Sequence, residues 1–286
     1  MQVWRLIRDG YNDGFYNMAV DEAVANAVEK GISPPTLRFY GWKSPTLSIG
    51  YSQKIDKSVD TAYCRKNKID IVLRTTGGRA VLHDKEITYS IISTKDNPLF
   101  PDNISGTYKV ISKALIRGLS FLGVDASISE LRTPNSLSPH LNPLPSGERD
   151  RVRVSCFAAA SQYEILVNGK KLIGSAQRRL KKSFIQHGSI PIISSHDILA
   201  SCLGLNKKDG KENFIELLKK RAIALNELNG RVFSYDEAAD ALIKGFKDVF
   251  KLVPEGGDQG MNFQSASLSE YELELSDKLY EKKKIL

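Results

Sequence analysis

Two residues of this sequence, Cys156 and Lys171, have the types and the spacing for covalent chemistry. Asn168 and Gly169 join two strand-like segments, and this dipeptide is typical of a tight hairpin turn because both positions need positive φ. A folded hairpin would bring Lys171 close to the chain just before its first strand, where Cys156 lies. A nearby ammonium lowers the pKa of a thiol, and the thiolate is the nucleophilic form. The pattern therefore indicates an activated cysteine.

Each of these two residues also has a simpler interpretation. A free cysteine is most often a small buried hydrophobic residue, and a strand lysine is most often solvated. We expect the side chain of Lys171 to face solvent, so that its truncation leaves the fold intact. Lys170, its neighbour, should point to the opposite face of the strand.

A second stretch, residues 71–83, could bind a ligand. An apolar strand leads into Gly77-Gly78, with Arg74 and Arg79 on either side. Glycines let the backbone approach an anionic or carbonyl-bearing ligand closely. The same pattern is common in ordinary hairpin turns, and it matches neither a Walker motif nor a Rossmann fingerprint.

Taken together, these stretches resemble the bacterial protein octanoyltransferases of the LipM type, in the superfamily of biotin and lipoate protein ligase catalytic domains. The motifs are Cys156-Phe157, Tyr163-Glu164, Gly-Lys-Lys-Leu-Ile-Gly-Ser-Ala-Gln at 169–177, Gln-His-Gly-Ser-Ile at 186–190 and Arg-x-Thr-Gly-Gly-Arg-x-Val-Leu-His at 74–83. Lipoate ligases usually carry a third glycine where this chain has Arg79, which favours a transferase.

The resemblance implies a role for each motif residue. Cys156 would be the acyl-thioester nucleophile, and Lys171 would lower its pKa and act as acid and base. The implied substrate-binding residues are Arg74, Gly77, Gly78, Arg79, His83, Gly174, Ser175, Gln177, His187 and Gly188. His187 is expected in the pocket wall. The helix that carries Asn17 and Asp21 would border the acyl pocket, although a polar helix surface is the simpler interpretation.

The implied reaction has two steps. Cys156 would take the octanoyl group from the phosphopantetheine arm of octanoyl-acyl carrier protein, and a lysine of a lipoyl-accepting protein, such as the glycine-cleavage H protein, would then take it from Cys156. Conversion of a thioester into an amide is downhill, so neither ATP nor another cofactor is expected. An ATP-dependent lipoate-protein ligase, a lipoyl or octanoyl amidotransferase between two proteins, and a non-enzymatic acyl-binding module remain alternatives.

Composition restricts the partners and the compartment. The net charge of +8 favours anionic partners, and both protein partners of the implied reaction would be acidic. No nucleic-acid-binding signature is visible, so nucleic acid is not expected. The three cysteines lack the spacing of a metal site or a disulfide framework. Without a signal core or a membrane-spanning run, we expect a soluble cytoplasmic protein.

Hydrophobic spacing predicts hairpin-like strands interspersed with helices. We expect strands at 3–7, 37–40, 46–51, 71–73, 86–93, 163–167, 170–177 and 184–190, and helices at 17–29, 108–122, 196–228, 238–250 and 268–284. Residues 10–14 are expected to form a turn, and Ser234 with Glu237 a capping box. The expected fold is an α/β domain on a mixed, largely antiparallel sheet with covering helices, as in the biotin/lipoyl ligase catalytic domains.

Three segments divide the chain. By resemblance, residues 1–250 form the catalytic domain. Within it, the composition predicts a flexible proline-rich insertion at about 134–150, before Cys156. Residues 251–286 are expected to be a C-terminal helical extension.

Overall fold

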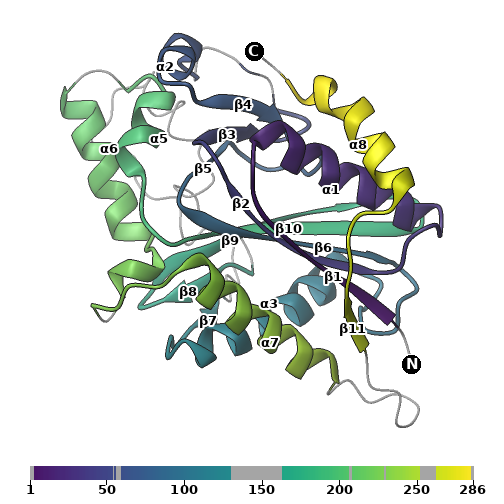
Figure 1. Ribbon diagram of the computed structural model, residues 1–286. Helices are drawn as coiled ribbons and strands as arrows, with labels where there is room; N and C mark the ends of the chain where they lie inside the picture. The colour runs from purple at the N-terminus through teal and green to yellow at the C-terminus, as the bar shows by residue number, and fades with distance from the viewer. Residues whose placement is uncertain are drawn as a thin grey trace.

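Two β-sheets with helices on both sides form the part of the chain that the computed structural model describes, residues 3–53, 55, 59–129, 163–205, 208–228, 230–251 and 262–284 (Figure 1). The larger sheet has eight strands in the order β11-β1-β2-β6-β10-β9-β8-β7, and the smaller has the order β4-β3-β5. The strands are β1 Val3–Asn12, β2 Thr36–Trp42, β3 Thr46–Ile49, β4 Asp70–Leu73, β5 Val81–His83, β6 Glu86–Thr94, β7 Ser127–Ile128, β8 Ile165–Val167, β9 Lys170–Arg179, β10 Ser183–Pro191 and β11 Asn262–Ser265. Cys156 and the proline-rich segment at about 134–150 lie outside the described residues.

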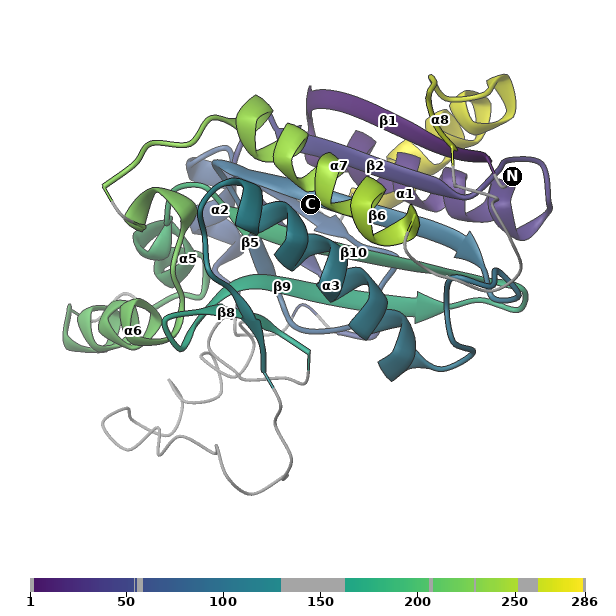
Figure 2. The same ribbon diagram turned by 90° about the horizontal axis from the view of Figure 1, so that it is seen from below.

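Four of the described helices cover the two faces of the large sheet in pairs. The described helices are α1 Gly14–Glu29, α2 Thr61–Lys66, α3 Ile104–Phe121, α5 His196–Cys202, α6 Lys208–Arg221, α7 Tyr235–Lys251 and α8 Glu270–Lys283, with a 3-10 turn at Leu225–Glu227. Figure 2 shows α3 and α7 side by side on one face of the large sheet, and Figure 1 shows α1 and α8 together on the other. None of the described helices is both long and apolar enough to cross a bilayer.

Alternating side chains on the central strands supply the two apolar layers. Ile91 and Phe184 belong to the cluster under α3 and α7, whereas their neighbours Ile92 and Ile185 pack with α1. Successive side chains of a strand point to opposite faces, so one strand feeds both layers. Because both faces are covered, β2 is buried along its whole length.

Strand pairing agrees with the expected fold class. β1 pairs in parallel with β2 and β11, and β3 pairs in parallel with β4, while the other described pairings are antiparallel. The prediction of a mixed, largely antiparallel sheet with covering helices is confirmed. The strands on either side of residues 43–45 form no hairpin, however, because β2 lies in the large sheet and β3 in the small one.

Local signals account for several element ends. Asn168 and Gly169 have φ of 51° and 74°, which confirms the predicted turn between the antiparallel strands β8 and β9. Ser234 accepts the amide of Glu237 at 3.2 Å, the first half of the predicted capping box. The turn expected over 10–14 is wrong, because β1 continues to Asn12 through an irregular register around Gly10, whose φ is 61°.

Candidate active site

A cavity lies between the two sheets, bordered by α1. Its empty volume is about 430 Å³, part of which is open to solvent. The lining residues are Met18, Tyr40, Ser48, Arg74, Val81, His83, Thr88, Gly174, Ser175, Ala176, His187, Gly188 and Ser189. Six expected binding residues are therefore brought together here: Arg74, His83, Gly174, Ser175, His187 and Gly188. The other four expected binding residues do not line this cavity: Gly77, Gly78, Arg79 and Gln177.

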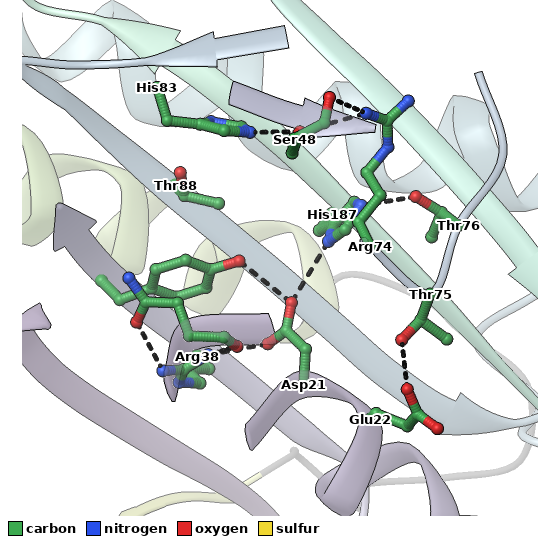
Figure 3. Close-up of polar contacts among 12 residues, drawn as sticks. Asp21, Glu22, Arg38, Ser48, Arg74, Thr75, Thr76, His83, Thr88 and His187 are labelled. Atoms are coloured by element: carbon green, nitrogen blue, oxygen red, sulfur yellow. Dashed lines mark hydrogen bonds and ion pairs between the residues drawn. The ribbon is translucent and has the colours of Figure 1, made fainter. Parts of the chain in front are cut away.

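Asp21 is the centre of the polar network beside the cavity (Figure 3). Its carboxylate accepts hydrogen bonds from Arg38 at 2.8 Å, from the Tyr40 hydroxyl at 3.0 Å and from His187 Nδ1 at 3.2 Å. Burial alone would raise the pKa of Asp21, but the His187 hydrogen bond and the Arg38 charge together lower it below the ordinary value. The same burial, with the Asp21 charge, raises the pKa of Tyr40 well above its ordinary range. Asp21 is therefore an ionised, buried acceptor.

His187 lies between Asp21 and the loop of residues 74–80, called the glycine loop because it contains Gly77 and Gly78. Its Nε2 is 2.6 Å from the Thr76 hydroxyl, while its Nδ1 faces Asp21. Burial is the main cause that lowers the pKa of His187 below 6.5. A neutral ring that donates from Nδ1 to a carboxylate must accept at Nε2, so the Thr76 hydroxyl donates to it.

His83 has a similar arrangement on the opposite wall. Its Nδ1 is 2.8 Å from Glu86 and its Nε2 is 2.7 Å from the Ser48 hydroxyl. Trp42 stacks on the His83 ring, with centroids 4.1 Å apart and 10° between the planes. Ser48 Oγ also accepts from Arg74 at 3.0 Å, so Ser48 joins His83 to Arg74.

Arg74 stabilises the glycine loop through hydrogen bonds to its backbone. Its guanidinium donates to the carbonyl of Gly77 at 2.8 and 3.2 Å, and to that of Arg79 at 2.7 Å. A Cβ on Gly50, just after β3, would lie 2.2 Å from the Gly78 carbonyl oxygen. Glycine at Gly50 therefore permits the close approach of this loop to the small sheet.

Lys171 is buried, in contrast to our expectation. Its residue is 4% exposed, and Nζ lies 2.5 Å from Glu164 Oε1. The expectation of a solvent-facing lysine is wrong because β9 is flanked on both sides here: Leu166 of β8 pairs with Lys171, and Ala222 forms a parallel bridge with it on a second segment. Lys170 is only half-buried. Cys156, the other half of the expected pair, lies outside the described residues.

Sequence reasoning missed the acidic partners of these groups. Of the two interpretations of the helix that carries Asp21, the polar surface is wrong, because Asp21 is 1% exposed. The helix does border a cavity, which Met18 lines. A usable signal was Arg38, a charged residue between Leu37 and Phe39, because a charge inside an apolar strand requires a buried partner. Glu164 was present in the Tyr163-Glu164 motif, but its pairing with Lys171 was not foreseen.

Solved structures share this architecture. One is a bipartite lipoate protein ligase from Thermoplasma acidophilum, with a TM-score of 0.74 and 22% identity over 99% of this chain and 94% of that one. Another is a lipoate-protein ligase A bound with ATP, with a TM-score of 0.72 and 24% identity over 99% and 96% of the two chains. At these identities the likeness concerns the fold, and it agrees with the expected fold class.

Sequence relatives are more similar. Octanoyltransferase LipM of Geobacillus kaustophilus is 41% identical over 254 residues, 89% of this chain and 88% of the relative. Octanoyltransferase LipM of Clostridioides difficile is 37% identical over 284 residues, 99% and 97% of the two chains. These relatives confirm the resemblance inferred from the motifs. Because residues 13–247 also match the model of the lipoyl protein ligase A/B catalytic domain, the chain belongs to that family.

Proposed function

We propose that this protein is an acyltransferase that moves an octanoyl group from octanoyl-acyl carrier protein to a lysine of a lipoyl-accepting protein, through a thioester on Cys156. Octanoyl transfer is supported by the similarity to the LipM octanoyltransferases over most of the chain. The acceptor we favour is a small acidic protein such as the glycine-cleavage H protein. The reaction needs no nucleotide, and we place it in the cytoplasm, where a free thiol persists.

The observation that carries the mechanism is the buried Lys171–Glu164 ion pair. A buried charge acts more strongly on its neighbours than a solvated one, because the surrounding protein screens it less than water does. A cation held in place by Glu164 can stabilise a thiolate that approaches it. The 2.5 Å contact also gives Lys171 a fixed orientation for proton transfer.

In the first step the Cys156 thiolate attacks the thioester carbonyl of the donor. A bond forms between the carbonyl carbon and Cys156 Sγ, the bond to the phosphopantetheine sulfur breaks, and Lys171 supplies the proton that this sulfur needs. In the second step the acceptor amine attacks, its proton returns to Lys171, and Cys156 leaves as the thiolate. The enzyme returns to its initial charge state, and no bond energy from ATP is required.

The cavity is the site that we assign to the octanoyl chain. Met18, Val81 and Ala176 provide apolar surface, and Gly174 and Gly188 line the cavity on β9 and β10, where Gly188 permits close packing between strands. At Gly188 an added Cβ would lie 2.5 Å from the Tyr89 ring and 2.7 Å from the Ser175 hydroxyl.

Contact with the thioester and the pantetheine arm is assigned to residues beyond the cavity lining: Gly77, Gly78, Arg79 and Gln177. They continue the two segments that carry Arg74 and Ser175. We also propose that residues 1–250 form the catalytic domain, with an insertion at about 134–150, and that residues 251–286 extend it.

Intact-protein mass spectrometry with octanoyl-acyl carrier protein, in the absence of ATP, tests the covalent step. Wild type, Cys64→Ala and Cys202→Ala should gain one octanoyl group, and Cys156→Ala should gain none. Cys64 and Cys202 are matched controls because both are buried in the described structure. Hydroxylamine should remove the adduct, and an added acceptor protein should take it.

Three results would contradict the proposal. Labelling that persists in Cys156→Ala would indicate another nucleophile. Labelling of an acceptor only with ATP and free octanoate would indicate a ligase. Labelling from an octanoylated acceptor protein but not from the carrier protein would indicate an amidotransferase.

A further inference from the structure

The C-terminal helix α8 lies along α1, outside residues 13–247 that match the family model. Its first turn is fixed to the large sheet. Arg5 of β1 donates to both Glu272 oxygens at 2.6 and 2.5 Å, and the Ser33 hydroxyl donates at 2.8 Å. Glu272 is fully buried and also accepts the Ser269 amide in a capping box. The start of α8 is therefore held in one position.

The last turn of α8 reaches the cavity loop through two carboxylate contacts. Lys283 is 4% exposed and forms an ion pair with Glu22 Oε2 on α1. The same oxygen accepts the Thr75 hydroxyl at 3.2 Å, a contact drawn in Figure 3. Thr75 lies between Arg74, which lines the cavity, and Thr76, which donates to His187. One carboxylate thus links the C-terminal helix to the loop beside the cavity.

A backbone contact supports the same connection independently. Lys284 forms an antiparallel bridge with Val72 of β4, two residues before Arg74. Tyr280, one turn earlier, packs its ring against Phe15 with 5.8 Å between centroids. The end of α8 therefore contacts the strand that enters the loop directly and is linked to the loop itself through Glu22 of α1.

The chemistry of Lys283 argues against simple packing. Lysine is rarely buried, and burial removes its hydration and its rotamer freedom. An apolar side chain would fill the same space at lower cost. The Glu22 side chain, in contrast, is 30% exposed, so without the ammonium its carboxylate can turn to water and leave Thr75 without this acceptor.

We propose that Lys283 is a positioning residue for acyl transfer, which holds the loop of residues 74–80 through Glu22 and Thr75 and so couples the placement of α8 to the geometry of the cavity. The effect on rate rests on the proposed function, whereas the effect on the loop does not.

The test compares Lys283→Met, Lys283→Arg and the matched control Lys282→Met, whose native side chain is exposed. In Lys283→Met we expect kcat for transfer to fall roughly three- to thirtyfold with little change in KM, the range of couplings carried through such contacts. Lys283→Arg should restore most of the rate, and Lys282→Met should match wild type. Amide hydrogen exchange over residues 74–80 should accelerate in Lys283→Met only.

Unchanged exchange and an unchanged kcat in folded Lys283→Met would overturn the proposal, as would an equal effect of Lys282→Met. If Lys283→Met fails to fold, Thr75→Val breaks the same connection at the loop end, and a wild-type rate in that variant is the contradicting result. If wild type transfers no octanoyl group, the proposed function fails, but the exchange measurement still decides whether α8 holds the loop.

Discussion

The two histidines of the cavity and the Lys171–Glu164 pair handle protons in different ways. Each histidine has both ring nitrogens in contact, with a carboxylate at Nδ1 and a hydroxyl at Nε2. Lys171 is instead a cationic donor, with Nζ 2.5 Å from Glu164 Oε1. A ring whose two nitrogens are both engaged is fixed in one tautomer, whereas the Lys171 ammonium is a donor only and is paired with a carboxylate.

This difference assigns separate tasks to the two regions. Proton transfer by His187 would require it to break its contact with Asp21 or Thr76, and burial already opposes its charged form. His83 and His187 therefore have a structural role: they stabilise the cavity wall and the glycine loop. We therefore assign the proton transfers of the proposed reaction to Lys171.

The largest effect should follow from Lys171→Ala. Removal of one partner of a buried ion pair leaves Glu164 without its cation, and such changes cost about 3–5 kcal/mol of unfolding free energy. Loss of a positioned acid and base should slow transfer by roughly 10²–10⁴-fold. Urea unfolding and single-turnover transfer rates measure the two quantities.

Lys170→Ala, at the half-buried neighbour, is the control and should change the unfolding free energy by less than about 0.5 kcal/mol. Equal losses in both variants would remove the distinction on which the assignment depends.

Asp21→Asn should lower the unfolding free energy strongly but reduce kcat only slightly. The amide keeps the shape of the carboxylate but loses its charge, so the buried Arg38 retains Asp9 as its ionic partner. We expect a loss of about 3 kcal/mol in unfolding free energy and, because Asp21 carries no proton in either proposed step, less than about a tenfold loss in kcat. Asp9→Asn, a partly exposed partner of the same arginine, is the control and should cost about 1 kcal/mol. A large kcat loss in a stable Asp21→Asn protein would place the network in the chemistry.

Local rules were enough for some of these features and not for others. The Asn168–Gly169 turn could be predicted because two adjacent residues determine its φ angles. The burial of Lys171 could not, since it depends on residue 222 pairing with β9, some fifty positions along the chain. The same holds for Asp21, whose partners Arg38 and His187 come from two different strands.

The local sequence pattern also does not determine which of the two sheets a strand joins. Residues 37–40 and 46–51 both have strand-like sequences, but which sheet each joins depends on pairings with β6 and β4. The C-terminal helix could be expected from its spacing, while its contact with the cavity loop through Lys283 and Glu22 required the folded chain.

The smallest expected effect concerns His187 alone: it is the dependence of the unfolding free energy on pH. The pKa of His187 in the folded protein is lowered below 6.5 by burial, so the unfolded chain takes up this proton first as the pH falls. Its contribution is complete above about pH 6.5 and is lost below it, at up to about 1.36 kcal/mol per pH unit for one proton. The lowered pKa of Asp21 acts in the same direction but in a more acidic window, below the ordinary value of 3.8.

His187→Gln retains a donor for Asp21 and an acceptor for Thr76. The difference in unfolding free energy between wild type and this variant therefore separates the contribution of His187 from that of His196, whose pKa is also lowered. Unfolding free energies measured from pH 7.5 to about pH 4.5 should therefore fall more steeply for wild type. Parallel curves for the two proteins would mean that His187 is not held neutral, and the contrast with Lys171 would lose its physical basis.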